Sequence, residues 1–329
     1  MKIIYFFLAA LWLFSCSTRK ETAVVSIIFD SDIGPDYDDV GAMALLHAFA
    51  DNGEAKILAT VSCNAFETTA PTINVINTYF NRPEIPVGIL KSTTPYEPCR
   101  QGWTQFIVEK YPHAIKRNDD AQEAVSLYRR ILSVQPDGSV TIVTVGFFTN
   151  LANLLDSSPD VYSPLSGKEL VIKKVKHLVS MAARMDANTT SGHEFNIYAD
   201  PGSARKVLSE WPTSILLSGF EIGAKILTGA RLIANDQIQN SPVKDAYRVA
   251  LEKDNNTMGR NSWDQTAVLV AVRGWEPYFN LRKVNFEIKE DGTNVLIPGE
   301  NFMYLTEKMP PEETSKLIED LMMHQPGLH

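Results

Sequence analysis

The stretch that most constrains the fold of this chain lies near its start, at residues 24–42. An apolar run of strand length, 24–29, leads into a loop that contains Gly34 and Pro35, and the apolar spacing of a helix begins at Val40. Because open α/β sheets build their sites at the carboxyl ends of their strands, this pattern predicts a strand, a site loop and a helix. Five aspartates crowd into ten residues at this junction: Asp30, Asp32, Asp36, Asp38 and Asp39.

Carboxylates packed this closely require either protons or a cation. Two like charges about 4 Å apart repel by roughly 4 kcal/mol at an effective dielectric near 20, and a hard, oxygen-binding metal ion relieves that repulsion. Helix capping is the simpler interpretation, in which Asp38 or Asp39 accepts hydrogen bonds from the first helical turn. Capping needs one acidic group, whereas this loop supplies five, so the metal interpretation is favoured.

Two other kinds of acidic loop can be tested on spacing. An EF-hand counted from Asp30 requires Gly at its sixth position and Glu at its twelfth, where this chain has Pro35 and Gly41. A dehalogenase-type phosphatase also places an Asp-x-Asp pair after its first strand, but it does not ask for the second pair at 38–39. The EF-hand is excluded, and the phosphatase stays a distant alternative.

Beyond residue 55, apolar segments typical of strands alternate with segments typical of helices. Strands are expected at 56–62, 85–89, 140–145, 175–181 and 214–218. Helices are expected at 69–80, 121–132, 201–209, 243–253 and 265–272. Residues 91–118 are expected to form an irregular cap, and the alternation at 284–288 before Asp291-Gly292 predicts a β-hairpin. The fold class is therefore α/β, with an open, mostly parallel Rossmann-like sheet covered by helices on both faces, in a single domain over 24–329.

The first residues have the pattern of an export signal. Lys2 precedes a short apolar run that ends at Phe14, so residues 1–15 are expected to be a signal peptide. Residues 13–16 resemble a bacterial lipobox, which predicts a lipid anchor at Cys16, a tether over 16–23 and a membrane-anchored lipoprotein of the periplasm or cell envelope. An ordinary secretory signal with an incidental Cys16 stays the alternative.

Composition excludes some partners. The net charge is −8, and nucleic acid is excluded as a partner because backbone binding needs a basic face. With Cys16 committed to lipid, only Cys63 and Cys99 remain, so the domain is not a disulfide scaffold, and pairing of these two is left open. Association into a homo-oligomer is also left open.

The Asp-x-Asp-x-Gly loop followed by Asp38-Asp39 resembles the signature of the inosine-uridine nucleoside hydrolases, in a longer variant with residues 35–37 between Gly34 and the Asp38-Asp39 pair. Three later segments, 141–152, 188–201 and 262–268, resemble further motifs of that family in the right order. Thr149 and Asn150 are expected to cap the following helix, and Asp200 is expected to cap the next with Pro201 at its first position.

The resemblance implies calcium-dependent hydrolysis of the N-glycosidic bond of ribonucleosides, giving free base and ribose. It implies one Ca²⁺ on the side chains of Asp32, Asp39 and Asp264 and on the backbone carbonyl of Val145, with Asp32 also acting as general base. The positions matching the family's substrate-binding residues are Asp38, Asn64, Met181, Asn188, Glu194, Asn196 and Trp263.

One position departs from the best-known family pattern. Many members place His before the last metal-binding Asp, where it protonates the departing base, but this chain has Trp263. An indole can stack on a base, which favours a preference for purine nucleosides. A lipid-anchored nucleoside-binding or sugar-binding protein without turnover stays the alternative function. Such a protein would not need Asp32 as a general base that activates water.

Overall fold

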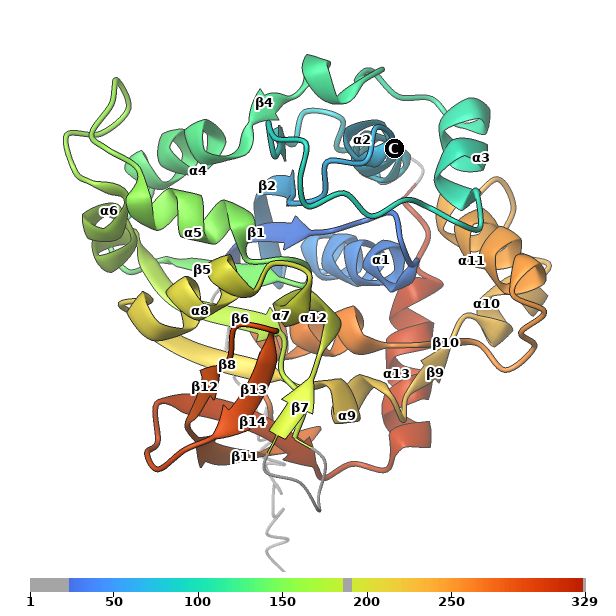
Figure 1. Cartoon of the computed structure of the whole chain (residues 1–329). Helices are drawn as coiled ribbons and strands as arrows, with labels where there is room; N and C mark the ends of the chain where they lie inside the picture. Colours follow the sequence, from blue (N-terminus) through green and yellow to red (C-terminus); the bar gives the residue numbers. More distant parts are fainter. Residues whose placement is uncertain (1–23, 186–190, 328–329) are drawn as a thin grey trace, which may run out of the picture.

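The computed structural model describes residues 24–185 and 191–327, and its centre is a nine-stranded sheet (Figure 1). The strands of this sheet are β1 (Val25–Ser31), β2 (Ala55–Ser62), β3 (Val87–Ile89), β4 (Gln122–Glu123), β5 (Val140–Thr144), β6 (Val175–Met181), β8 (Ser214–Ser218), β11 (Phe279–Val284) and β14 (Phe302–Glu307). Their order across the sheet is β11-β14-β8-β6-β5-β1-β2-β3-β4. Only the β11–β14 pair in this sheet is antiparallel, which confirms the open, mostly parallel arrangement.

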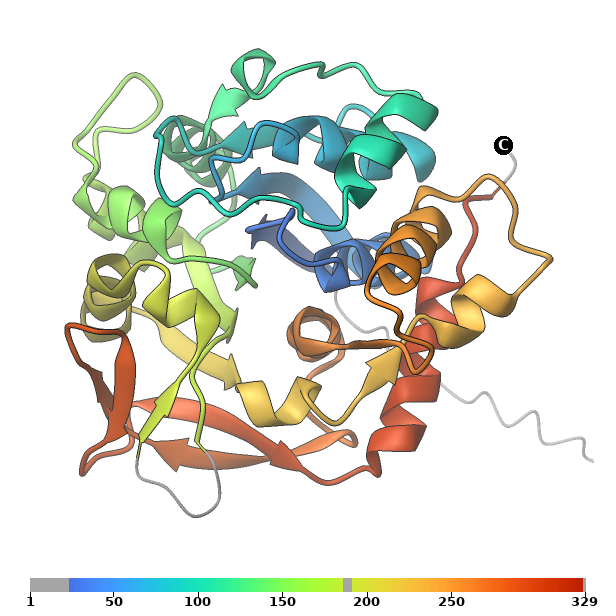
Figure 2. The ribbon, with the colours of Figure 1, turned by 45° about the vertical axis from the view of Figure 1, so that its right-hand side comes forward.

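Helices cover both faces of the sheet, as the two ribbon views show (Figures 1 and 2). One face carries α1 (Asp38–Asp51), α2 (Thr69–Tyr79), α3 (Trp103–Lys110), α11 (Pro242–Lys253), α12 (Trp263–Arg273) and α13 (Pro311–Met322). The other carries α4 (Ala124–Ser133), α5 (Thr149–Asp156), α6 (Gly167–Lys174) and α8 (Pro201–Glu210). Side chains alternate between the two cores along β1, where Ile27 and Phe29 face the first and Ile28 faces the second. Burial on both faces explains why this strand is continuously apolar.

The chain reverses its direction of travel across the sheet between β1 and β5. It proceeds from β1 through β2 and β3 to β4, returns to β5 on the other side of β1, and continues through β6 and β8. It then reaches β11 at the edge of the sheet and comes back to β14, which lies between β11 and β8. The strand loops on the two sides of such a switch point leave in opposite directions and open a crevice at the carboxyl edge. The acidic loop at 30–39 follows β1 and therefore lies at this crevice.

Several expected elements are present with small changes at their ends, and β6 and β8 have the predicted bounds. The expected hairpin is confirmed, because β12 (Phe286–Ile288) pairs antiparallel with β13 (Thr293–Leu296). The irregular cap expected at 91–118 was wrong in part: α3 lies within it, since Trp103 and Ile107, spaced one helical turn apart, are both buried in the core. Four elements were not expected from the sequence: α6, α13, β11 and β14.

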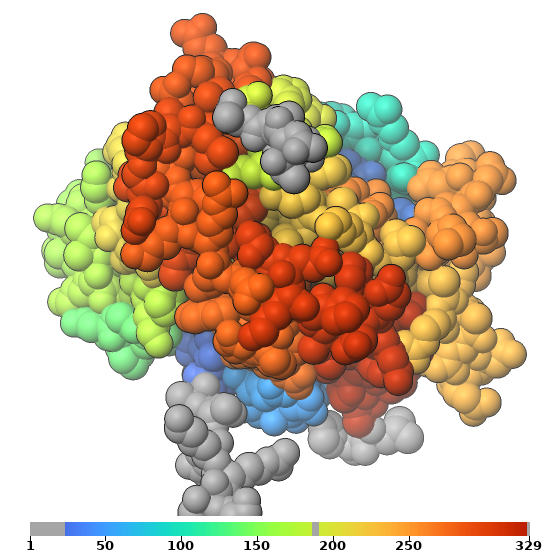
Figure 3. All heavy atoms as spheres, turned by 90° about the horizontal axis from the view of Figure 1, so that it is seen from below, coloured from blue at the N-terminus to red at the C-terminus, as the bar shows by residue number. Residues whose placement is uncertain are grey.

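The remaining short elements line the loops around the sheet. They are β7 (Ser191–His193), α7 (Phe195–Tyr198), α9 (Phe220–Gly223), β9 (Leu227–Thr228), α10 (Ala230–Ala234), β10 (Arg260–Asn261) and a 3-10 helix at Asn118–Asp120. Seen from below, the C-terminal segments make up a large part of the surface (Figure 3).

The expected signal peptide, the tether and Cys16 lie outside the described residues. Within residues 24–185 and 191–327, no helix is long and apolar enough to cross a membrane. Cys63 and Cys99 are both free thiols, so the pairing left open by the sequence is not made.

Candidate active site

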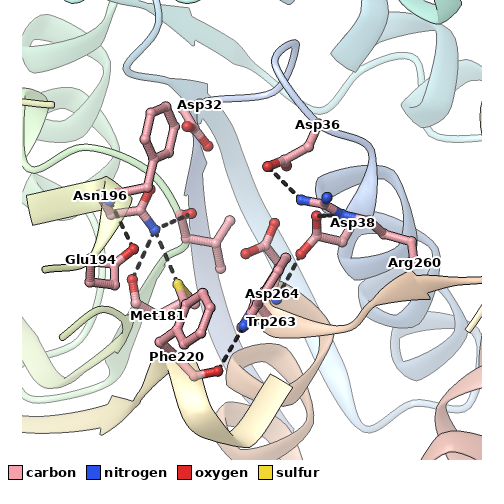
Figure 4. A pocket seen from close by; sticks show the side chains of 12 residues that line it. Asp32, Asp36, Asp38, Met181, Glu194, Asn196, Phe220, Arg260, Trp263 and Asp264 are labelled. Carbon is pink, nitrogen blue, oxygen red and sulfur yellow. Dashed lines mark hydrogen bonds and ion pairs between the residues drawn. The ribbon is translucent and has the colours of Figure 1, made fainter. Parts of the chain in front are cut away.

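A cavity of about 260 Å³ opens at the carboxyl edge of the sheet, at the switch point (Figure 4). Asp32 comes from the loop after β1, Val145 follows β5, and Met181 ends β6. Trp263 and Asp264 form the first turn of α12. The full lining is Asp32, Asp36, Asp38, Val145, Met181, Glu194, Phe195, Asn196, Phe220, Arg260, Trp263 and Asp264.

The loops after β1 and β5 meet closely because residue 146 is glycine. A Cβ atom at Gly146 would lie 2.4 Å from the backbone nitrogen of Asp32 and 2.7 Å from the Sγ atom of Cys63. The backbone N–H of Val145 donates to the carbonyl of Asp30 at 2.8 Å, which extends the β1–β5 ladder up to this contact. The absence of a side chain at 146 therefore brings Asp32 and the Val145 carbonyl to the same edge of the cavity.

The carboxylates of this site repel one another. Burial raises the pKa of Asp32, Asp39 and Asp264 well above the usual range, and the charges of the neighbouring aspartates raise these pKa values further. Both carboxylate oxygens of Asp39 are buried and have no hydrogen-bond partner among the described residues. A buried carboxylate with two unpaired oxygens needs a cation or a proton. The capping interpretation fails, because Tyr37 is the N-cap residue of α1 and no side chain caps that helix.

The donor set suits a hard cation. Asp32, Asp39, Asp264 and the Val145 carbonyl all present oxygen, the ligand atom that Ca²⁺ and Mg²⁺ prefer. As they stand, however, the described His, Cys, Asp and Glu side chains include no group of three or more that could hold a metal ion. The fit of this site to a metal ion rests on the unpaired oxygens of Asp39.

The opposite wall of the cavity is a hydrogen-bonded group around Asn196. The side-chain nitrogen of Asn196 donates to the carbonyl oxygens of Val145 at 2.9 Å and Met181 at 3.0 Å. The same nitrogen lies 3.2 Å from the Met181 sulfur. Glu194 accepts hydrogen bonds from the backbone N–H groups of Asn196 at 2.8 Å and Ala183 at 3.3 Å. Burial raises the pKa of Glu194 to about 7 despite these bonds. The structure thus brings together three of the residues expected to bind substrate.

The guanidinium of Arg260, which was not expected from the sequence, pairs with the aspartates on the acidic side of the cavity. The Nε atom of Arg260 donates to Oδ1 of Asp38 at 2.9 Å, and its Nη2 atom lies 2.6 Å from Oδ2 of Asp36. The second Asp38 oxygen accepts from the backbone N–H of Asp264 at 3.4 Å. Burial raises the pKa of Asp38 to about 7, against the opposing effect of Arg260. The sequence did contain a signal that could have identified Arg260. A loop with five carboxylates needs positive partners, and Arg260 lies only four residues before Asp264.

Trp263 is held firmly at the edge of the cavity. Its indole N–H donates to the carbonyl of Phe220 at 2.8 Å, and the two rings stack with centroids 5.1 Å apart. The guanidinium carbon of Arg260 lies 4.8 Å from the centroid of the indole. Phe220, which the sequence analysis did not single out, therefore forms an aromatic wall together with Trp263.

Asn64 has a different role from the expected contact with substrate. Its side-chain nitrogen donates to the carbonyls of Asp32 at 2.9 Å and Glu97 at 2.8 Å, while its oxygen accepts from the N–H groups of Phe66 and Glu97. Asn64 is fully buried and does not line the cavity, because these backbone groups use its whole amide. It positions the Asp32 loop instead. Asn188 lies outside the described residues.

The capping role expected for Thr149 and Asn150 was wrong. Phe148 is the N-cap residue of α5, and no side chain caps that helix. Thr149 donates instead to Asp200 at 2.6 Å, and Asn150 donates to Asp30 at 3.1 Å. Tyr128 also donates to Asp30, at 2.8 Å, so that Asp30 ties β1 to α4 and α5 behind the cavity. Asp200 caps α8 as expected, accepting from the N–H of Ser203 at 3.2 Å.

The family of the chain follows from comparison with known proteins. The model of the family "Inosine-uridine preferring nucleoside hydrolase" matches residues 27–314. This chain belongs to that family. The match confirms the resemblance seen in the sequence and, with it, the enzyme class of nucleoside N-ribohydrolases.

Individual relatives are more distant. An uncharacterized protein of Schizosaccharomyces pombe is 28% identical over 284 residues, which cover 80% of this chain and 85% of the relative. The pyrimidine-specific ribonucleoside hydrolase RihA of Salmonella paratyphi C is 30% identical over 218 residues, and the match spans 61% of its length and 60% of this chain. The purine-preferring ribonucleoside hydrolase from Gardnerella vaginalis is similar in structure, with a TM-score of 0.68 at 16% identity, covering 91% of this chain and 99% of that one. This structural likeness confirms the nucleoside hydrolase fold.

Proposed function

We propose that this protein hydrolyses the N-glycosidic bond of ribonucleosides in a calcium-dependent reaction and releases free base and ribose. The observation that carries the proposal is the state of the Asp39 carboxylate. Both of its oxygens are buried without a hydrogen-bond partner among the described residues, beside the cavity that Asp32 and Asp264 line. Such a carboxylate calls for a hard cation, and sugar hydroxyls are oxygen ligands that can complete its coordination.

Asp32 is the general base in this proposal. Its carboxylate lines the cavity, and burial with neighbouring negative charges raises its affinity for a proton. A Ca²⁺ ion held by Asp32, Asp39, Asp264 and the Val145 carbonyl would lower the pKa of a water molecule and would polarise the sugar hydroxyls. Asp32 then removes the proton of the water that attacks the anomeric carbon.

The residues on the two sides of the cavity hold the ribose. Glu194 and Asn196 offer a carboxylate and an amide on one wall, which suit the adjacent donors and acceptors of a sugar. Asp38 faces the cavity from the other side and accepts from the 2′-hydroxyl. Arg260 and the Asp264 N–H hold the Asp38 carboxylate in place, and a carboxylate oxygen has a second lone pair for the sugar.

The leaving base packs against the aromatic wall of Trp263 and Phe220, which favours purine nucleosides. Stacking on an aromatic side chain is worth roughly 0.5–1.5 kcal/mol beyond area burial, and it can raise the basicity of a purine imidazole nitrogen, which pyrimidines lack. The relatives point both ways, since RihA is named pyrimidine-specific and the Gardnerella enzyme is named purine-preferring. Specificity constants for inosine and uridine decide the matter: a value at least tenfold higher for inosine is expected, and equal values contradict the preference.

The deciding experiment is an assay of the purified domain, residues 24–329, with a mixture of nucleosides. Free ribose and free base are expected to appear with Ca²⁺ present and to disappear with a chelator. The alternative is a nucleoside-binding protein without turnover, which would bind the same compounds in calorimetry and release no ribose. Asp32→Asn separates the two functions further, because it should keep binding and lose turnover.

We also propose that the protein is exported and anchored by lipid at Cys16, on the strength of the apolar run before Ser15-Cys16. Cys16→Ala should leave the membrane fraction or stay unprocessed. Unlipidated wild-type protein in the cytoplasm would contradict the anchor. Association into a homo-oligomer is tested by the mass of the purified protein in solution.

A further inference from the structure

We propose that Arg260 stabilises the departing base, as a fixed positive hydrogen-bond donor in place of a general acid. The inference rests on the proposed function and assigns the leaving-group role that Trp263 cannot fill by proton transfer. An indole N–H is a donor with no proton to give at neutral pH, and here it is already bonded to the Phe220 carbonyl.

Arg260 is the only cationic side chain among the described residues that line the cavity. No histidine lines the described cavity either; His193, for example, stacks on Tyr198 and lies 3.2 Å from the carbonyl of Asp291. Arg184 stacks on Phe220, 4.6 Å from the centroid of its ring, but does not line the cavity. Arg260 is therefore the positive charge that a base in this cavity meets directly.

The guanidinium is held rigidly and keeps unused donors. Asp38 and Asp36 bind its Nε and Nη2 atoms at 2.9 and 2.6 Å, and the Trp263 ring packs beside it. The Nη1 atom has no acceptor among the described residues, and the side chain is 20% exposed. Because an arginine has five N–H donors in a planar fork, these contacts leave donors for a ligand in the cavity.

The position of Arg260 suits the base and not the sugar. Figure 4 shows its guanidinium between Asp36 and Asp38, across the cavity from Glu194 and Asn196. A ribose held by that far wall and by Asp38 directs its base toward the side of the cavity formed by Arg260 and Trp263. Ring nitrogens and carbonyl oxygens of nucleobases are the acceptors that a guanidinium binds.

The chemistry of the step explains why a fixed cation helps. The oxygen of water bonds to the anomeric carbon while the carbon–nitrogen bond breaks, and the electron pair of that bond moves onto the base. Asp32 takes the proton of the water, and the stacked base takes a proton from solvent at its ring nitrogen as it leaves. Negative charge grows on the base only as the bond breaks, so donors preorganised around it favour the transition state over the bound nucleoside.

The test compares two substrates with different leaving groups. Inosine leaves as a poorly stabilised base anion, whereas p-nitrophenyl riboside leaves as a phenolate that needs little help. Removing one preorganised donor typically lowers kcat by about 10²–10³. Arg260→Gln should therefore lower kcat for inosine by about 10²-fold or more and kcat for the nitrophenyl compound by less than about tenfold, and Arg260→Lys should recover part of the loss.

Controls separate this role from a structural one. Arg248→Gln makes the same chemical change at an arginine that pairs with Asp245 and Glu252 and does not line the cavity, and it should change neither rate. Thermal unfolding checks that Arg260→Gln is folded. Equal losses on both substrates would show that Arg260 only positions Asp38, and an unchanged rate for inosine would remove its role altogether; either result overturns the inference. Wild-type protein that cleaves neither compound would overturn the proposed function itself.

Discussion

The side-chain nitrogen of Asn196 lies 2.9 Å from the carbonyl oxygen of Val145 and donates a hydrogen bond to it. The same nitrogen donates to the carbonyl of Met181 at 3.0 Å, so one amide joins α7 to the carboxyl ends of β5 and β6. Val145 is an expected metal ligand and Asn196 an expected sugar ligand. Their contact couples the two halves of the site through one hydrogen bond.

Replacing Asn196 tests this coupling. Asn196→Leu keeps the approximate size of the side chain but leaves two carbonyls without their donor, and an unsatisfied buried polar group costs about 1–3 kcal/mol. We expect a loss of that size in the free energy of unfolding, measured in urea, together with at least a hundredfold loss of turnover. Asn285→Leu, which removes an exposed hydrogen bond to the carbonyl of Pro298, should change neither. An Asn196→Leu protein with wild-type stability would show that the Val145 carbonyl is not held in this way.

Asp39→Asn should have opposite effects with and without calcium. In metal-free protein the substitution removes a buried carboxyl group whose ionisation burial and the neighbouring carboxylates oppose, so the melting temperature should rise, by about 2 °C or more if the change is worth about 1 kcal/mol. In calcium at a hundred times its Kd, wild-type protein should be stabilised by about 2.7 kcal/mol, and the variant should not. Equal stabilisation of both proteins by calcium would exclude Asp39 as a ligand.

Gly146→Ala should disturb the site through the backbone alone. Its Cβ atom would lie 2.4 Å from the Asp32 nitrogen, far inside contact distance, so the loops after β1 and β5 must separate. We expect turnover to fall at least tenfold while the circular dichroism spectrum keeps its α/β character. Gly202→Ala is the matched control for activity, since its φ is not positive and a Cβ atom there would only make an ordinary contact of 3.8 Å with Oδ1 of Asp200. Normal turnover by Gly146→Ala would show that the close approach of the two loops is not needed.

The buried side chain of His47 should lower the free energy of unfolding in acid. Burial lowers its pKa from the usual 6.5 to about 3, and its Nε2 atom lies 3.0 Å from Oδ1 of Asn77. Below pH 6.5 this histidine binds a proton in the unfolded chain but stays neutral in the folded protein. Its contribution to the free energy of unfolding is therefore complete above pH 6.5 and is lost as the pH falls toward 3. His47→Gln removes the effect and keeps a donor for Asn77. Unfolding in urea from pH 7 to pH 4 should show a wild-type slope steeper than that of the variant by up to about 1.4 kcal/mol per pH unit. Parallel slopes would assign the acid sensitivity to other groups.

The sequence alone determined the fold class and named most of the residues that line the cavity. The strand–loop–helix at 24–42, the alternation of apolar segments and the three later motifs each have a local signal, because side-chain period and turn residues follow from short-range geometry. The carboxyl ends of β1, β5 and β6 could be assigned to one edge for the same reason, since parallel strands end together. Asp32, Asp264 and Asn196 lie at that edge as predicted.

Only the tertiary structure decided which partner each polar group has. Asn64, Thr149 and Asn150 have side chains whose spacing suits a ligand or a cap, yet they bind backbone or side-chain groups that are distant in the chain. Arg260 meets Asp38 across more than two hundred residues, a separation that no local pattern encodes. Hydrogen bonds and ion pairs depend on distances of a few tenths of an ångström in three dimensions, whereas the sequence pattern fixes only which face and which edge a residue occupies.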